Sequence, residues 1–331
     1  MDLNITPRAE DTKSTTKNSV NDLWISFHNN LKLQGKSENT LKNYKTDMDC
    51  FKNYLIEKQK TDSINALGLP QIIEYGKYLQ VKYSSNNSRR RRVQTLRIFF
   101  DYLVETGISS TNPVRKIPTS PKFVDIPRPT KFIAVKTLWL SLIEPQQNRG
   151  QLNQLIQQRN QVIFLLIYHA GLKVSDISHL KLDQVSLGKD SRVLITPKNR
   201  DPYTIPLNSF TAKVIKRYLY ILEIEKNRSN MKFIEILFNA NPHKILSGGL
   251  SSRGIEILME EYRKKLSIEV TPKSLRQSAI VNWLNKGFND STVKEWMGVA
   301  PSYSLKNYKK VKDEYFYNDL ALEELYEHKY H

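Results

Sequence analysis

The chain has 331 residues, enough for one large domain or two ordinary ones, since domains usually contain roughly 100 to 200 residues. Its 51 Lys and Arg outnumber 33 Asp and Glu, a net charge of +18 that indicates a nucleic-acid partner, although a low-GC genome also enriches Lys. The single cysteine excludes an intramolecular disulfide, the scattered histidines lack metal-ligand spacing, and no apolar run is long enough to cross a bilayer, so we expect a cytoplasmic protein without a metal or a membrane partner.

The N-terminal part is predicted to be helical. Residues 1–18 contain few apolar side chains and are expected to form a flexible tail. Over residues 19–108 the apolar residues recur at helical spacing, which predicts a domain of several short helices. The last of them is expected from Arg89 to Glu105, after a Ser/Asn-rich N-cap segment. Its arginines form a candidate DNA-binding surface, because clustered guanidinium groups at a helix start can meet phosphates: Arg89, Arg90, Arg91, Arg92 and Arg97.

A dense group of prolines in residues 109–130 predicts a linker, since no helix or central strand tolerates so many. Residues 131–311 are expected to form a second, mostly helical domain. Two short β runs around a polar turn, between Arg192 and Leu207, predict a hairpin within it. Residues 312–331 predict a C-terminal helix that either caps its own domain or contacts a neighbouring protomer. The fold class is therefore mainly α with a small β-hairpin, in two domains.

One constellation in the second domain is suited to binding an anion. Thr271 is expected to cap a helix that begins at the following proline. Lys273 and Arg276 lie three residues apart, so their side chains project from the same side of this helix and their charges can converge. A second helix is expected to end at Gly298, and Tyr308 follows ten residues later.

This order of motifs resembles the C-terminal signature of the tyrosine recombinases, which include phage integrases and Xer resolvases. Residues 170–176, A-G-L-K-V-S-D, resemble the first catalytic box of the family, T-G-L-R-x-S-E. Lys198, eight residues before Pro206, matches the lysine of the family's hairpin. Residues 40–55 and 88–113 resemble its core-binding, SAM-like domain. The resemblance extends from about residue 20 to residue 312.

The resemblance implies a site-specific recombinase or integrase that cuts and rejoins double-stranded DNA through a 3′-phosphotyrosyl bond. Tyr308 would be the nucleophile, Arg276 would stabilise charge on the non-bridging oxygens, and Lys198 would protonate the departing 5′ oxygen. The covalent bond retains the energy for rejoining, so no ATP, metal or other cofactor is required. The family also implies a homotetramer on two DNA sites, and leaves open a second recombinase as a partner.

Three positions depart from the family pattern. Lys173 replaces an arginine and keeps the charge, but it lacks the planar fork that matches phosphate. Lys273 replaces a histidine, and Val299 replaces a His or Trp and donates no hydrogen bond. Asp176, in the first box, has a supporting role. Two interpretations follow: a divergent but working site, or a relative that binds DNA without cutting it.

Two alternatives lie outside the recombinases. A helical RNA-binding protein would match the motifs by chance, and a type IB topoisomerase would share the chemistry. The recombinase-like N-terminal domain favours strand exchange. The biological role, whether phage integration, transposition or chromosome resolution, is left open by the sequence.

Overall fold

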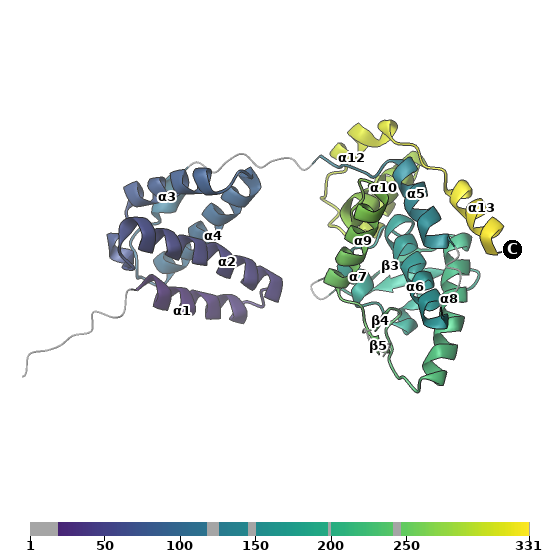
Figure 1. Cartoon of the computed structure of the whole chain (residues 1–331). Coiled ribbons are helices and arrows are strands. Elements are labelled where there is room, and N and C mark those ends of the chain that lie inside the picture. Colours follow the sequence, from purple (N-terminus) through teal and green to yellow (C-terminus); the bar gives the residue numbers. More distant parts are fainter. Residues whose placement is uncertain (1–18, 118–125, 145–149, 198–199, 241–245, 331) are drawn as a thin grey trace, which may run out of the picture. The chain divides into compact units, whose positions relative to one another are not determined.

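The computed structural model describes residues 19–117, 126–144, 150–197, 200–240 and 246–330 (Figure 1). The chain divides into two compact units, Met1–Asp125 and Ile126–His331. This boundary falls within the proline-rich segment 109–130. The predicted tail, residues 1–18, lies outside the described residues. Within the described ranges, none of the helices has the length and apolarity needed to span a membrane.

The first unit is a small helical domain (Figure 1), and three of its four long helices begin after a capping serine. Ser19, Ser37 and Ser85 each accept a hydrogen bond from a backbone N–H of the first turn, which satisfies a donor that the helix itself leaves open. The predicted last helix is confirmed and begins three residues earlier than expected. The helices are α1 (Val20–Leu33), α2 (Glu38–Tyr54), α3 (Leu69–Lys82) and α4 (Asn86–Glu105), with the short η1 (Leu55–Gln59), η2 (Ile64–Ala66) and η3 (Pro113–Lys116).

Aromatic rings fill the core of this unit. Phe27 on α1 meets Phe99 on α4 with ring centroids 5.5 Å apart, and Phe51 on α2 meets Tyr75 on α3 at 4.9 Å. The segment after α4 belongs to the same core, because Val114 in η3 is fully buried. The first part of the predicted linker therefore packs on the first unit.

The second unit surrounds a central helix, α6, whose second half is buried on all sides (Figure 1). Helices α5, α8 and α10 pack against it. The helices are α5 (Phe132–Ile143), α6 (Gln151–Tyr168), α7 (Val174–Ser178), α8 (Ser209–Arg228), α9 (Ser252–Leu266), α10 (Pro272–Asn285), α11 (Asp290–Met297), α12 (Lys306–Val311) and α13 (Asp319–Tyr330), with the 3₁₀ turns η4 (Leu182–Gln184) and η5 (Lys312–Glu314).

Two small antiparallel sheets accompany these helices. The predicted hairpin is confirmed as β2 (Arg192–Ile195) and β3 (Tyr203–Pro206), with Val193 opposite Ile205 and Ile195 opposite Tyr203. Burial alternates along β2, so one face of the hairpin covers the core. The sequence did not predict β1 (Val185–Ser186), or the pair β4 (Phe238–Ala240) and β5 (Leu246–Gly248). Strands of two or three residues are too short to show a period.

The C-terminal segment folds onto its own unit. Leu322 and Tyr326 of α13 are buried, and the indole N–H of Trp139 donates to the carbonyl of Leu322 at 2.9 Å. The helix is shorter than predicted and begins at Asp319. The segment before it forms the 3₁₀ turn η5 and turns extended at Tyr315, and the Asn285 amide donates to the carbonyls of residues 312 and 315.

Asp319, at the start of α13, ties this helix to α6 and α10. Its carboxylate accepts hydrogen bonds from the Tyr168 hydroxyl at 3.0 Å, the Asn282 amide at 2.9 Å and the Lys286 ammonium at 2.5 Å, and lies 3.6 Å from His169 Nε2. Burial alone would raise the pKa of Asp319, but His169 and Lys286 hold it well below its usual range. The carboxylate is thus a charged anchor for the last helix.

Candidate active site

Arg276 binds three segments of the second unit together. Thr271 caps α10 as predicted, accepting from the backbone N–H of Ser274 at 3.0 Å. One turn later, Arg276 Nε donates to the carbonyl of Gly171 at 2.6 Å and Nη2 donates to the carbonyl of Met297 at 2.8 Å. These bonds use two of the five N–H donors of the guanidinium, so the group is fixed in place and retains donors for an anion.

The first box forms a tight turn between α6 and α7. Gly171 has a φ of +59°, and a Cβ there would lie 2.4 Å from the Trp283 ring. The glycine is therefore required both by its backbone conformation and by the close approach of α10. The turn presents the Gly171 carbonyl to Arg276 and leads directly into Lys173.

Lys173 lies at the N-terminus of α7, close to the Arg276 guanidinium. Its backbone N–H donates to the Asp176 carboxylate at 3.3 Å. Burial lowers the pKa of the Lys173 ammonium, the positive charges of Arg276 and Arg200 lower it further, and Asp176 opposes them. The first-box residues Lys173 and Asp176 thus share one electrostatic environment with Arg276.

Tyr308 also lies in this environment. It is on α12 and its side chain is only 7% exposed, whereas Tyr303, the nearest rival in the sequence, is 41% exposed. Burial lowers the pKa of Arg276, and among the groups that raise it, Tyr308 has the largest effect, ahead of Asp176 and Tyr203. Helix α12 packs against α10, and the Tyr308 phenol interacts electrostatically with the guanidinium that would bind a phosphate.

Gly298 ends α11 in a left-handed conformation with a φ of +57°, as the C-cap interpretation predicted. A Cβ there would lie 2.4 Å from Cζ and 2.5 Å from the hydroxyl of Tyr203, at the start of β3. Val299 follows and is partly buried against the core. The hairpin thus contacts the end of α11 through Tyr203, a residue that the sequence did not single out. Only its position five residues after Lys198 could have suggested it.

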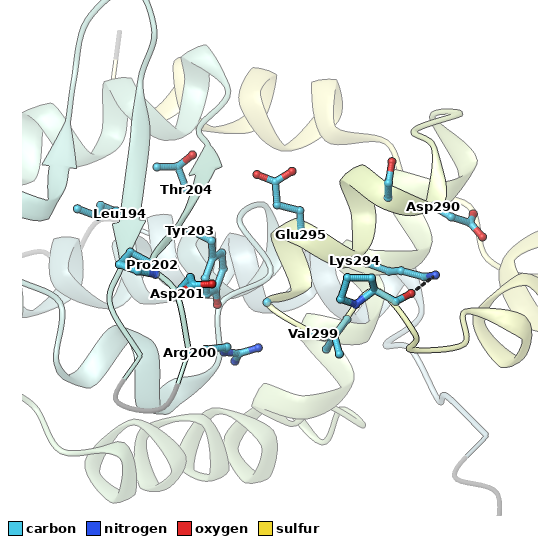
Figure 2. Close-up of a pocket in the computed structure, with 14 residues that line it drawn as sticks. Leu194, Arg200, Asp201, Pro202, Tyr203, Thr204, Asp290, Lys294, Glu295 and Val299 are labelled. Atoms are coloured by element: carbon cyan, nitrogen blue, oxygen red, sulfur yellow. Dashed lines mark hydrogen bonds between the residues drawn. The ribbon is translucent and has the colours of Figure 1, made fainter.

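A cavity of about 820 Å³ opens between the hairpin and the segment after α11. Arg200 and Tyr203 line one side of it, with the Arg200 guanidinium 5.5 Å from the centre of the Tyr203 ring. Val299 and Lys294 line the other side, where Lys294 donates to the carbonyl of Pro301 at 2.8 Å (Figure 2). The lining of this cavity therefore contains both cationic and hydroxyl-bearing side chains.

Two further predicted site residues have a different status. Lys273 is exposed on the first turn of α10, so its ammonium is accessible to solvent while Arg276 is largely enclosed. Lys198 lies outside the described residues. Among the residues whose placement is described, no group of three or more His, Cys, Asp or Glu side chains is arranged to hold a metal ion.

The arginine run on α4 requires a correction, because two of its members are used inside the first unit. Arg92 is 7% exposed, stacks 3.7 Å above the Tyr83 ring and donates to the carbonyl of Ser88 at 3.0 Å. Arg97 donates to the carbonyl of Ile117 at 3.1 Å and so holds the end of η3. Both guanidinium groups thus make contacts within the domain, and Arg92, which is buried against Tyr83, is a poor candidate for a DNA contact.

The other arginines of the run are partly exposed. Arg91 forms a salt bridge of 2.8 Å with the buried carboxylate of Asp47 and also donates to Asn43. Arg89 donates to the side chain of Asn86 within its own helix. Arg89, Arg90 and Arg91 therefore remain the candidate phosphate contacts of this domain.

Comparison with known proteins gives the same assignment for both units. Residues 145–314 match the phage integrase family, and residues 25–107 match the phage integrase N-terminal SAM-like domain. The chain is 27% identical over 283 residues to tyrosine recombinase XerC of Thermodesulfovibrio yellowstonii, covering 83% of this chain and 86% of the relative. It is 28% identical over 295 residues to tyrosine recombinase XerA of Thermococcus kodakarensis, covering 89% and 93%.

Solved structures of low identity share the fold. A lambda integrase(75-356) dimer bound to a COC′ core site superposes with a TM-score of 0.65 at 16% identity, covering 88% of this chain and 95% of that one. XerH site-specific recombinase bound to a palindromic difH substrate gives 0.65 at 15% identity, covering 83% and 77%. The resemblance seen in the motifs is confirmed, and with it the mainly helical fold in which a SAM-like domain precedes a catalytic domain. The chain belongs to the phage integrase family, the tyrosine recombinases that carry out site-specific DNA recombination.

Proposed function

We propose that this chain is an active recombinase that cuts and rejoins double-stranded DNA through a 3′-phosphotyrosyl bond at Tyr308. The observation that supports this most is the position of Arg276. Its guanidinium is fixed by two carbonyls at 2.6 and 2.8 Å, on a helix that packs against the helix of Tyr308, and it interacts electrostatically with the Tyr308 phenol. A phosphodiester is negatively charged and repels nucleophiles, so cleavage without a metal needs a preorganised cation beside the nucleophile.

In the proposed reaction, the Tyr308 oxygen attacks the scissile phosphorus and releases its proton to a water molecule. The bond from phosphorus to the 5′ oxygen breaks, and Lys198 supplies the proton for that oxygen, by resemblance to the hairpin lysine of the family. Rejoining reverses these steps. Because each bond that breaks is replaced by another of similar energy, neither ATP nor a metal ion enters the cycle.

The divergent residues are compatible with this chemistry. Lys173 places a positive charge beside Arg276, and the lowered pKa of its ammonium, caused by burial and by that neighbouring charge, makes it a better proton donor than an exposed lysine. Lys273 is exposed at the start of α10 and can reach a phosphate from the solvent side. The negative charge of Asp176 partly balances the positive charges of Lys173 and Arg276.

Double-stranded DNA is the proposed partner. The net charge of +18 supports it, as do the relatives of known structure, which include a lambda integrase dimer on a core site and a lambda integrase tetramer bound to a Holliday junction. We extend this to a homotetramer acting on two DNA sites. Arg89, Arg90 and Arg91 would contribute phosphate contacts that position the first unit on the duplex.

The test uses a nicked suicide duplex, in which the cleaved strand loses a short fragment and cannot be rejoined. The duplex is built on the genomic sequence that the protein binds most tightly, and the product is a protein–DNA adduct that survives denaturation. We expect an adduct with the wild-type chain and with Tyr303→Phe, none with Tyr308→Phe, and no effect of a metal chelator. If the wild-type chain binds this duplex and forms no adduct, the chain is a DNA-binding protein and the catalytic proposal is wrong.

A further inference from the structure

By resemblance to the family, Val299 leaves the phosphate-binding groups one hydrogen-bond donor short. The family position carries a His or Trp, each of which offers an N–H donor, and Val299 has only methyl groups there. Oxyanion stabilisation depends on donors placed in advance around the charge, and removing one donor typically slows such reactions by roughly 100- to 1,000-fold. A working site in this chain therefore needs another donor near the end of α11.

Tyr203 lies at that place. Its ring and hydroxyl pack directly over Gly298, the residue before Val299, at distances that leave no room for a Cβ. The same tyrosine lines the cavity that Val299 lines from the other side (Figure 2). The hairpin thus brings a hydroxyl group against Gly298, next to the residue at which the chain lacks a donor.

We propose that the Tyr203 hydroxyl donates a hydrogen bond to a non-bridging oxygen of the scissile phosphate, in place of the missing donor at Val299. This inference rests on the proposed recombinase activity and adds a catalytic residue to it. The hydroxyl keeps its proton throughout, so no bond other than a hydrogen bond forms or breaks at Tyr203.

The surroundings of Tyr203 suit a donor. Burial raises the pKa of the phenol and the Asp176 carboxylate raises it further, while Arg200 and Arg276 oppose them without reversing the shift. The hydroxyl is therefore protonated at neutral pH. The influence of Arg276 on this group also places Tyr203 in the same electrostatic neighbourhood as the guanidinium that would bind the phosphate.

The test is Tyr203→Phe, which keeps the ring over Gly298 and removes only the hydroxyl. With the suicide duplex described above, we expect adduct formation to slow by roughly 100- to 1,000-fold while duplex binding is unchanged. Tyr220→Phe, which alters an exposed tyrosine on α8, is the matched control and should react at the wild-type rate. Adding Val299→His to the Tyr203→Phe chain should restore most of the lost rate, because it returns a donor to the family position.

A second measurement separates a phosphate contact from a structural effect. Sulfur accepts hydrogen bonds poorly, so a duplex with one stereoisomer of a phosphorothioate at the scissile position should react slowly with the wild-type chain. The same isomer should show no such slowing with Tyr203→Phe, since that contact is already gone. An equal thio effect in both chains, or an unchanged rate in Tyr203→Phe, would overturn the inference and leave the proposed function intact. An adduct that persists in Tyr308→Phe and vanishes in Tyr203→Phe would overturn it too, by making Tyr203 the nucleophile.

Discussion

Replacing Asp319 with asparagine removes the charge that holds α13 and keeps the size of the side chain. The amide oxygen can still accept from Tyr168, but the amide nitrogen then faces the donors of Asn282 and Lys286, which accept nothing from it. Hydrogen bonds to charged groups contribute about 1.5 to 3 kcal/mol each, and Lys286 is half exposed, so its contribution is at the low end. We expect Asp319→Asn to lower the free energy of unfolding by about 2 to 4 kcal/mol at pH 7.

The pH dependence gives this prediction a second measurable consequence. The folded-state pKa of Asp319 lies below its unfolded value of about 3.9, so the stabilisation is fully present above that value and is lost as the pH falls through the folded pKa. The stability difference between wild type and Asp319→Asn should therefore narrow as the pH falls below about 4.

Denaturant unfolding followed by tryptophan fluorescence suits this experiment, because Trp139, Trp283 and Trp296 lie in the second unit and only Trp24 in the first. Asp313→Asn is the matched control. That carboxylate pairs with Lys312 but is 79% exposed, and its loss should cost under about 0.5 kcal/mol. If Asp319→Asn proves as mild as this control at pH 7, the anchoring role of Asp319 is refuted.

Three further outcomes follow from the same structure. Gly171→Ala, which strains the backbone and crowds a buried ring, should cost about 2 to 4 kcal/mol in denaturant unfolding, whereas Gly35→Ala, with a similar φ of +70° and open space, should cost only about 1. Lys173→Arg should speed adduct formation roughly tenfold, because the guanidinium can donate two parallel hydrogen bonds to a phosphate. A slower rate would show that Lys173 does not bind the scissile phosphate. Arg92→Ala should lower the free energy of unfolding by about 2 to 4 kcal/mol, because Arg92 is buried against Tyr83. Arg89→Ala should leave that free energy unchanged and reduce by about one the slope of the logarithm of the binding constant for duplex DNA against the logarithm of the salt concentration. The reverse pattern would contradict the burial argument.

Much of the fold could be predicted because the signals are local. Thr271 caps α10, Gly298 ends α11, and the hairpin shows its alternation, all within a few residues of sequence. The anion-binding constellation was also local in part, since Lys273 and Arg276 share one helix. The hydrogen bonds of the Arg276 guanidinium could not be predicted, because their acceptors, the carbonyls of Gly171 and Met297, lie in two other segments of the chain.

Arg92 shows where a local signal was overlooked. Arg92 precedes Leu96 by four residues, so it shares the helix face of the buried stripe that includes Phe99 and Leu103. The spacing alone could therefore have placed Arg92 inside the domain. Arg97 is a different case, because its acceptor at Ile117 lies twenty residues away and only the packing of η3 reveals it.

Tyr203 was missed for a physical reason as well. Its role depends on contact with a glycine that lies 95 positions further along the chain, and no periodicity or cap marks such a pair. An aromatic residue at a strand start is ordinarily explained by β propensity. The absent donor at Val299 was visible in the sequence, but the residue that faces it was not.

The way α13 is held has a practical consequence for deletion experiments. Removing the residues from Asp319 onward would strip Leu322 and Tyr326 from the core and expose the rings of Trp139 and Phe210 to water. A chain shortened in this way would expose apolar surface and aggregate, so its behaviour would not report on assembly. Phe316, which is exposed just before the helix, and the similarly exposed Leu320 on its first turn offer a cleaner route, since replacing them alters the outer surface of this segment without opening the unit beneath.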